Sequence, residues 1–264
     1  IFEVLMAVIR VEIIAHLSPK TNMKWIASKG FLLFFIFFLS SCVLDHSGSR
    51  PTSYWIWGNM IPKRVSHEKD LYVYQGIFDK VRGNYTYHFE GLSPRPIAKY
   101  SGKLTLTYRL ENLLPPSIIV SRFVSHQKAW RRHNIVTDGI QIDYDSPTKK
   151  LLEYADWLTL LKKEIGSNVS ISITGLGDWL ASAPSGHLNN LSEKTSFIAF
   201  MMYHGGHPLK NTSNYIEYLE KLSIPFKIGR LEKQTNTNTS KRVFQAQNYK
   251  GEIIFIPSGV NQIG

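Results

Sequence analysis

The chain has 264 residues, of which 43% are hydrophobic, and it holds six Trp, thirteen Tyr and fourteen Phe. This composition supports a sizeable core and excludes wholesale disorder. The formal net charge is +11, but Lys and Arg are scattered and form no long basic run, so we expect no nucleic-acid partner. A basic surface suits an anionic envelope or an acidic glycan. The single cysteine, Cys42, excludes an intrachain disulfide.

The sequence of residues 23–41 has the three-part layout of a secretory signal peptide. Lys24 and Lys29 give it a positive start, and residues 31–39 form an unbroken apolar run that is too short to span a bilayer permanently. Because the chain begins with Ile and a better start follows at residue 23, we interpret residues 1–22 as upstream sequence or a misplaced start.

Cys42 directly follows the small residues at the end of this signal. The ending LSSC (39–42) resembles the lipobox of bacterial lipoproteins. The resemblance implies cleavage before Cys42, acylation of its thiol and of the new amino terminus, and anchoring in a membrane. Val43 follows the Cys, which by the family rule implies the outer membrane, facing the periplasm, if the host has two membranes. A signal-anchor helix with an incidental Cys is the alternative. In the lipoprotein interpretation, residues 42–53 form a polar tether between the anchor and the rest of the chain.

Short runs rich in β-branched and aromatic residues recur along the rest of the chain, as strands do. They cover 54–58, 71–78, 104–110, 118–124, 139–145, 169–175, 197–203, 226–231 and 253–256. Apolar residues at helical spacing predict a helix over 148–165 and shorter helices over 126–133 and 214–222. From residue 118 onward strands alternate with helices, which favours βαβ units and a parallel sheet.

These elements predict an α/β fold, a (β/α)8 TIM-type barrel over residues 54–264. The segment 89–110 fits this pattern poorly, and its LTLTYRL run is open to a second interpretation as an inserted hairpin in an incomplete barrel. An open doubly wound sheet is the rival fold. The chain contains no GxGxxG or GxxxxGK[ST] motif, and we expect no cofactor. We expect a monomer.

The most informative segment is DGIQIDYD at 138–145. Side chains alternate across a strand, so Gln141, Asp143 and Asp145 should share one face and point into the barrel. The acids would then lie at the carboxyl end of a strand, where barrel enzymes keep their chemistry. Two adjacent carboxylates repel, which predicts that one has a raised pKa and can serve as a general acid. The alternative is a structural pair that binds backbone amides or a basic side chain.

DGIQIDYD resembles the DGIDIDWE strand of the chitinase-like glycoside hydrolases (family eighteen). The resemblance implies cleavage of a glycosidic bond, with Asp145 at the position of the proton donor and Asp143 at that of the Asp which orients it. Gln141 and Asp145 both depart from the family residues, Asp and Glu. A second segment, FMMYHG, resembles the MxYD segment of those enzymes and implies that Tyr203 and His204 hold the acetamido group of the substrate.

The mature chain resembles still more a bacterial lipoprotein family with a domain of unknown function, which is expected to form glycosidase-like barrels. The pieces that carry this resemblance are WIWG (55–58), YVYQG (72–76), GIQIDYDSPT (139–148), SITGLGDWL (172–180) and MMYHG (201–205). The resemblance brings no activity with it.

Other candidate ligand contacts have a structural alternative. Asp178 and Trp179 are interpreted as an acid and a stacking platform for sugar, or as a helix N-cap and a core Trp. Trp57 either lines a cleft or packs in the core. Gln75, near a strand end, is a substrate contact by resemblance alone.

Two histidines, His204 and His207, follow a strand in the sequence HGGH. With an Asp they are the best starting point for a metal site, although His residues separated by glycines are more often loop residues. We therefore expect no metal.

The sequence thus predicts a lipid-anchored cell-envelope protein with a glycoside-hydrolase-like barrel that acts on a glycan. Asp145 would be the acid and Asp143 its partner. Two alternatives remain: a catalytically inactive glycan-binding barrel, and a metal-dependent hydrolase or deacetylase built on His204 and His207.

Overall fold

The computed structural model describes residues 52–184, 186–204, 206–210, 212–233 and 241–256, all within the compact unit Arg50–Gly264. The expected signal peptide, Cys42 and most of the tether lie outside the described residues. No helix in these ranges is long and apolar enough to cross a membrane.

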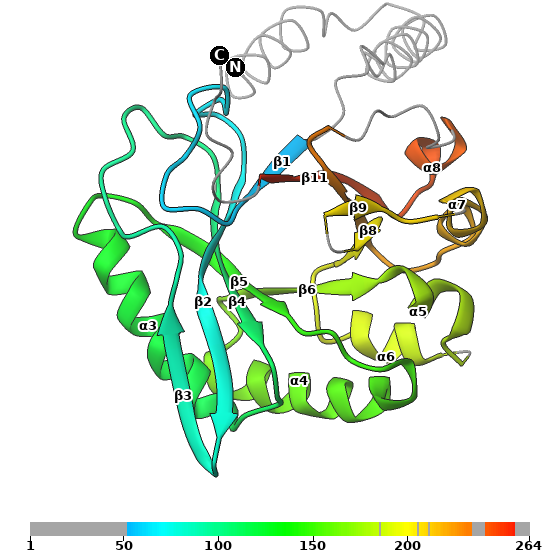
Figure 1. Ribbon diagram of the computed structural model, residues 1–264, viewed down its shortest axis with the longest axis horizontal. Coiled ribbons are helices and arrows are strands. Elements are labelled where there is room, and N and C mark those ends of the chain that lie inside the picture. The colour runs from blue at the N-terminus through cyan, green and yellow to red at the C-terminus, as the bar shows by residue number, and fades with distance from the viewer. Residues whose placement is uncertain (1–51, 185, 205, 211, 234–240, 257–264) are drawn as a thin grey trace, which may run out of the picture. The chain divides into compact units, whose positions relative to one another are not determined.

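Eight parallel strands form a closed barrel (Figure 1). They are β1 (Thr52–Ile56), β2 (Leu71–Val81), β4 (Leu104–Leu110), β5 (Thr137–Asp143), β6 (Ser170–Leu176), β7 (Ile198–Met201), β10 (Phe226–Leu231) and β11 (Tyr249–Ile256). Neighbours pair in the order β1-β11-β10-β7-β6-β5-β4-β2, and β1 also pairs with β2, which closes the ring. The TIM-type barrel is therefore confirmed, and the open sheet is excluded.

Helices cover the barrel wall after β4 and after most later strands. They are α3 (Pro116–Arg131), the 3-10 turn η1 (Thr148–Lys150), α4 (Leu151–Ile165), α5 (Gly177–Ser182), α6 (His187–Ser192), α7 (Thr212–Glu220) and α8 (Lys241–Gln245). Within the described residues, no helix follows β1 or β2. The outer ring of helices is incomplete there, as the sequence allowed.

The predicted strand over 118–124 is wrong, because these residues belong to α3. Pro116 stands at the start of that helix, where a missing N–H costs nothing. Ile119, Phe123 and Trp130 are buried at helical spacing against the barrel. The β-branched residues of this run suggested a strand. They are accommodated in a helix because only one stripe of its residues has to be buried against the barrel.

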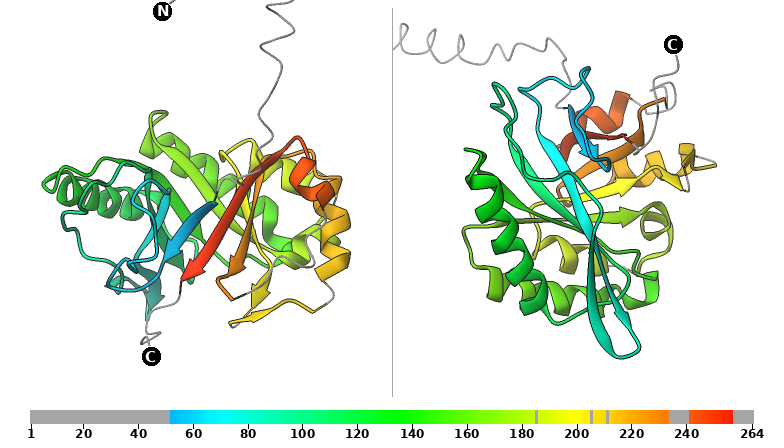
Figure 2. Two further views of the ribbon diagram at one scale, coloured as in Figure 1. Left: turned by 90° about the horizontal axis from the view of Figure 1, so that it is seen from above. Right: turned by 60° about the vertical axis from the view of Figure 1, so that its left-hand side comes forward.

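The hairpin is also in a different place from the one predicted. The run LTLTYRL is the barrel strand β4, and the hairpin is formed by β2 and the antiparallel β3 (Asn84–Phe89). This hairpin extends past the neighbouring strands beside α3 (Figure 2). Gly76, at a bulge in β2, permits the close approach of β3, since a Cβ there would lie 2.1 Å from the backbone oxygen of His88.

The barrel interior is unusually polar at mid-height. Gln141 is fully buried there and accepts hydrogen bonds from Trp55 Nε1 and from Thr107 Oγ1 (3.4 Å). Its amide donates to Ser172 Oγ at 3.4 Å. This network separates the two ends of the interior, which we call the mouth, at the carboxyl ends of the strands, and the floor, at their amino ends.

Candidate functional site

A cavity of about 580 Å³ opens at the mouth of the barrel. Six residues that the sequence suggested line it: Trp57, Asp143, Asp145, Asp178, Tyr203 and His204. They come from the ends of several different strands and from the segments that follow, which is the usual construction of a barrel active site.

Asp143 is the last residue of β5 and is only 2% exposed. Thr174, on the neighbouring strand β6, donates a hydrogen bond of 2.7 Å to Asp143 Oδ1. Burial raises the pKa of Asp143 from 3.8 to about 6, and the nearby charge of Asp145 adds to this, while the Thr174 hydrogen bond and Arg109 oppose it. Asp143 is therefore partly protonated near neutral pH.

Asp145 lies two residues beyond the end of β5, and 45% of its side chain is exposed. Its Oδ2 is 3.3 Å from a terminal nitrogen of Arg109. The two carboxylates therefore differ: one is enclosed by the barrel, and the other is open to the cavity and to anything that enters it.

Arg109, on β4, is the functional residue that sequence reasoning missed. Its guanidinium lies 3.6 Å from Asp143, 3.3 Å from Asp145 and 2.9 Å from Glu111. These carboxylates raise the pKa of Arg109 although burial opposes them, so it stays charged. The alternation of LTLTYRL places Arg109 on the same face as Thr105 and Thr107, but its position opposite Asp143 depends on the register of β4 with β5, which the structure supplies.

Aromatic side chains form one wall of the mouth. Trp57 is stacked on Tyr74 with ring centroids 4.2 Å apart, and its other neighbour is the edge-on ring of Phe255 at 5.5 Å. Phe255 also stacks with Tyr203 at 5.4 Å. Burial raises the pKa of Tyr203 well above its usual value, so its hydroxyl keeps a proton and can donate it in a hydrogen bond. Such walls suit the apolar faces of a sugar ring.

The histidines do not assemble a metal site. His204, in β8 (Tyr203–His204), pairs with His207, in β9 (His207–Pro208), across a short antiparallel ribbon, and both are exposed. In the described part of the chain, no three or more His, Cys, Asp or Glu side chains gather where they could hold a metal ion. The metal-dependent alternative therefore lacks a ligand set in these residues.

Gln75 and Trp179 are placed beneath the surface and outside the cavity lining. Gln75 donates to the backbone oxygen of Leu92 at 3.2 Å and accepts from Trp130 Nε1 at 3.3 Å. Trp179 is fully buried and donates to the backbone oxygen of Ser146 at 2.9 Å. Both residues therefore stabilise the fold in this structure, and the structural interpretation of Trp179 describes its position.

Gln141 and Asp178 occupy different levels of the site. Gln141 lies below the mouth in the mid-barrel network and does not line the cavity. Asp178 does line it, from the first turn of α5, and accepts a hydrogen bond of 3.2 Å from Thr148. It is thus a third carboxylate at the mouth, and it does not cap the helix.

Comparison with solved structures supports the barrel. The xylanase and α-amylase inhibitor protein XAIP-II of Scadoxus multiflorus is 13% identical with a TM-score of 0.52, over 78% of this chain and 93% of that one. The related inhibitor XAIP-III is 11% identical with a TM-score of 0.50, over 79% and 93%. An endo-β-N-acetylglucosaminidase of Cordyceps militaris is 13% identical with a TM-score of 0.41, over 82% and 87%. No curated protein matches the sequence.

The fold shared with these two inhibitor proteins agrees with the expected TIM-type barrel. The segment that carries β4, α3, β5, α4 and β6 also matches a family model. This match confirms the resemblance to a family with a domain of unknown function. Residues 103–200 match the family model described as Domain of unknown function (DUF3142).

Proposed function

We propose that this protein is a cell-envelope glycoside hydrolase whose active site is the mouth of the barrel. The observation that carries the proposal is the pair of unlike carboxylates: Asp143 is buried with a pKa of about 6, and Asp145 is exposed in a cavity of about 580 Å³. Paired acids in different environments are the usual equipment for cleaving a glycosidic bond. The glycosidase-like barrel itself supports this assignment.

In the proposed mechanism Asp145 donates a proton to the glycosidic oxygen, and Asp143, which orients Asp145, holds a proton that it can pass to that acid. Asp143 Oδ1 is fixed by Thr174 at 2.7 Å, so its second oxygen is the one available to the neighbouring acid. Arg109 holds Asp145 in an ion pair at 3.3 Å. A productive ligand must therefore draw Asp145 away from Arg109 before the proton can be transferred.

The remaining mouth residues would bind the sugar. Trp57 and Tyr203 offer aromatic faces, and the protonated Tyr203 hydroxyl is a donor for a carbonyl oxygen of the substrate, such as that of an acetamido group. His204 lies beside it on the same strand. If an acetamido oxygen attacks the sugar carbon, no protein nucleophile is required; otherwise Asp178 is the available carboxylate.

The second candidate is a barrel that binds a glycan without cleaving it. Arg109 favours this alternative, because it neutralises the carboxylate that would have to donate a proton. The same fold in the XAIP-II and XAIP-III structures is that of proteins described as inhibitors of glycan-degrading enzymes. This alternative predicts affinity without products.

Localisation belongs to the same proposal. We infer that the chain is secreted and that acyl chains on Cys42 anchor it, with the barrel joined to the membrane through residues 42–53. The support is the signal-like sequence before Cys42. Metabolic labelling with a palmitate analogue should mark the protein, and Cys42→Ala should lose the label. Retention of the label in Cys42→Ala would contradict the anchor.

A product assay tests the proposed function. The mature chain would be incubated with chitin, peptidoglycan and exopolysaccharide fragments, with and without a chelator. New reducing ends that are insensitive to the chelator support the glycosidase. Fragments that bind but yield no product support the binding barrel. Activity abolished by the chelator would overturn both in favour of a metal-dependent hydrolase.

A further inference from the structure

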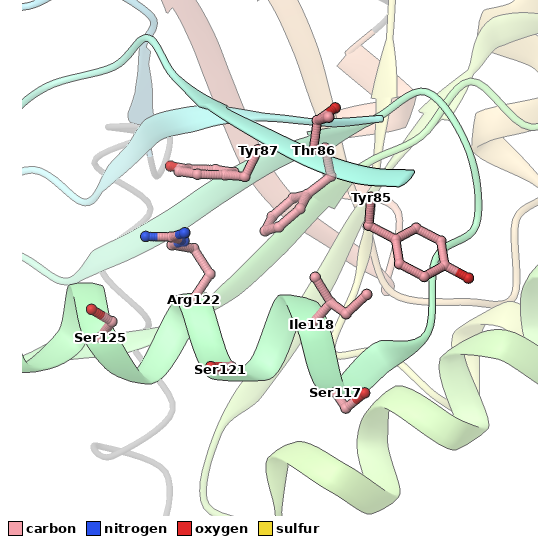
Figure 3. A pocket seen from close by; sticks show the side chains of 9 residues that line it. Tyr85, Thr86, Tyr87, Ser117, Ile118, Ser121, Arg122 and Ser125 are labelled. Atoms are coloured by element: carbon pink, nitrogen blue, oxygen red, sulfur yellow. The ribbon is translucent and has the colours of Figure 1, made fainter. Parts of the chain in front are cut away.

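A groove of about 600 Å³ lies outside the mouth, between β3 and α3 (Figure 3). The helix side is made by Ser117, Ile118, Ser121, Arg122 and Ser125, and the strand side by Tyr85, Thr86 and Tyr87; Phe78, on β2, also lines it. Figure 3 shows Arg122 and Ile118 pointing from α3 toward the strand. The proposed mechanism at the mouth uses none of these residues.

Arg122 is a cation that lies over an aromatic ring and has no counterion among the described residues. Its guanidinium lies 4.6 Å from the centre of the Tyr87 ring, and Tyr87 is held by a hydrogen bond of 2.7 Å from its hydroxyl to the backbone oxygen of Gln75. No carboxylate among the described residues forms an ion pair with Arg122, which is exposed. Because stacking occupies one face of the planar group, its edge N–H donors remain available for an oxyanion.

Three serines extend the polar surface along the helix. Ser117, Ser121 and Ser125 are spaced by four residues, so they lie on one face, and all three are exposed. Their hydroxyls make no hydrogen bond to another residue in the described ranges. They can therefore donate to, or accept from, the hydroxyls of a ligand that lies along α3.

The surroundings of the groove are electropositive. Between Glu111 and Asp138 the sequence has no Asp or Glu, whereas it has Arg122, Lys128, Arg131 and Arg132. The first turn of α3 has no acid to offset the positive end of the helix. Burial and the charge of Arg122 lower the pKa of His126 to about 4, so this neighbour is neutral at physiological pH.

One carboxylate acts on the groove from the strand side. Burial raises the pKa of Tyr87, Arg122 opposes this and Glu90 adds to it, but Glu90 Oε2 already accepts a hydrogen bond from Tyr74 at 3.1 Å. At the other end of the groove Tyr85 is 46% exposed, with the Lys80 ammonium 5.7 Å from its ring centre. An exposed ring of this kind offers a flat apolar face for a sugar.

We propose that this groove is a second glycan-binding site, separate from the mouth, which recognises a sugar that carries a carboxylate or a sulfate. The oxyanion pairs with the edge of Arg122, the serine hydroxyls bind sugar hydroxyls, and Tyr85 supports the next ring. The site requires no catalysis at the mouth, so it stands whether the protein is a hydrolase or a binding barrel.

Calorimetric titration of the full chain tests this site. The probes are an oligogalacturonide, its fully methyl-esterified form, and a sulfated oligosaccharide of similar length. We expect the acidic uronide or the sulfated sugar to bind and the ester to bind at least about tenfold more weakly, because esterification removes the charge that Arg122 recognises. The stronger of the two acidic probes then identifies the oxyanion.

Matched variants assign the binding to the groove. Arg122→Gln should lose about tenfold in affinity, whereas Arg131→Gln, which makes the same charge change on the same helix outside the groove, should bind as the parent does. Arg122 does not line the mouth, so its variant leaves the mouth residues in place and this result is separate from the outcome there. The proposal is overturned if neither acidic probe binds, if the ester binds equally well, or if both arginine variants lose the same affinity.

Discussion

The two ends of the barrel interior bury side chains of opposite charge, Asp143 at the mouth and Lys227 at the floor, and give them different partners. At the mouth, burial raises the pKa of Asp143 to about 6. At the floor, burial lowers the pKa of Lys227 to about 8. Desolvation thus moves both groups toward their neutral forms. Asp143 has the opposite charge of Arg109 at 3.6 Å. Among the described residues, Lys227 donates hydrogen bonds to two hydroxyls, Ser53 at 3.3 Å and Tyr72 at 3.2 Å, and Asp70 acts on it without forming an ion pair.

This difference shows which end of the barrel is prepared for chemistry. The mouth places a charged guanidinium and three carboxylates around a cavity of about 580 Å³. The floor encloses a smaller space of about 290 Å³, in which Lys227 lies over the rings of Tyr72 and Phe197 at 5.3 and 5.1 Å. Charges that can exchange partners favour a ligand site, and a charge fixed by aromatic rings and hydroxyls favours a structural role.

The largest expected change in stability comes from removing the charge at the floor. Below about pH 8 Lys227 is protonated in both the folded and the unfolded chain, so the full cost of burying its charge is present. Between about pH 8 and its ordinary pKa of 10.5 the folded chain releases the proton first, and stability rises with pH. The stability of Lys227→Met relative to the parent should therefore fall by roughly 3 kcal/mol across that range.

Denaturant unfolding of both proteins at several pH values measures this difference. Lys149→Met, on an exposed residue, is the control and should show no such trend. A pH-independent difference between Lys227→Met and the parent would contradict the buried charge at the floor.

The mouth should show the opposite dependence. Below about pH 4 Asp143 is protonated in both states, and between pH 4 and 6 the unfolded chain releases the proton first, so stability falls as pH rises. Asp143→Asn removes this cost and can still accept the hydrogen bond from Thr174. Its stability relative to the parent should increase by on the order of 3 kcal/mol between pH 4 and 7, as measured by urea unfolding. A variant less stable at pH 7 than at pH 4, relative to the parent, would mean that Arg109 pairs with a fully charged Asp143.

The network between the two ends can be broken at Gly229. A Cβ at this position would lie 2.6 Å from Trp55 Cζ3, so Gly229→Ala must displace the ring that donates to Gln141. We expect a loss of about 1–3 kcal/mol of stability, because overpacking forces side chains out of their preferred rotamers. Thermal unfolding and the near-ultraviolet spectrum of Trp would report it. Unchanged stability would show that the middle of the barrel is loosely packed.

The smallest expected effect is a shift in the pKa of Asp143 when Arg109, which contacts both acids, is replaced. Arg109→Gln removes a charge that lowers the pKa of Asp143, so that pKa should move above about 6. Carboxyl carbon chemical shifts followed through a pH titration measure it directly. A downward shift would mean that Arg109 acts mainly by excluding water from Asp143.

Much of the fold could be predicted because strands and helices bury residues at different spacings along the chain, every second residue in a strand and every third or fourth in a helix. The runs at 226–231 and 104–110 coincide with β10 and β4, since each alternates inward and outward residues. The run at 118–124 was misassigned because apolar β-branched residues on a short helical stripe are indistinguishable from a strand without knowledge of the sheet they cover. The β2–β3 hairpin was missed because β3 lies at the edge of the sheet and has no buried residue.

The site was predictable where chemistry is local and not where it depends on a neighbouring strand. DGIQIDYD indicated Asp143 and Asp145 through their order in one segment. Thr174 and Arg109 touch Asp143 only because β6 and β4 flank β5, and the sequence does not state that register. Gln75 was placed at a ligand by resemblance, but the bulge beside Gly76 turns it into the wall of the barrel.

The most direct test of the central claim is the rate at which the parent, Asp145→Asn and Asp156→Asn release reducing ends from a cleaved substrate. Asp156 is an exposed acid on α4, so its variant controls for loss of one negative charge. If Asp145 is the proton donor at the mouth, Asp145→Asn should lose about 100- to 10,000-fold in rate while Asp156→Asn keeps the parent rate. An Asp145→Asn variant as active as the parent would contradict the account.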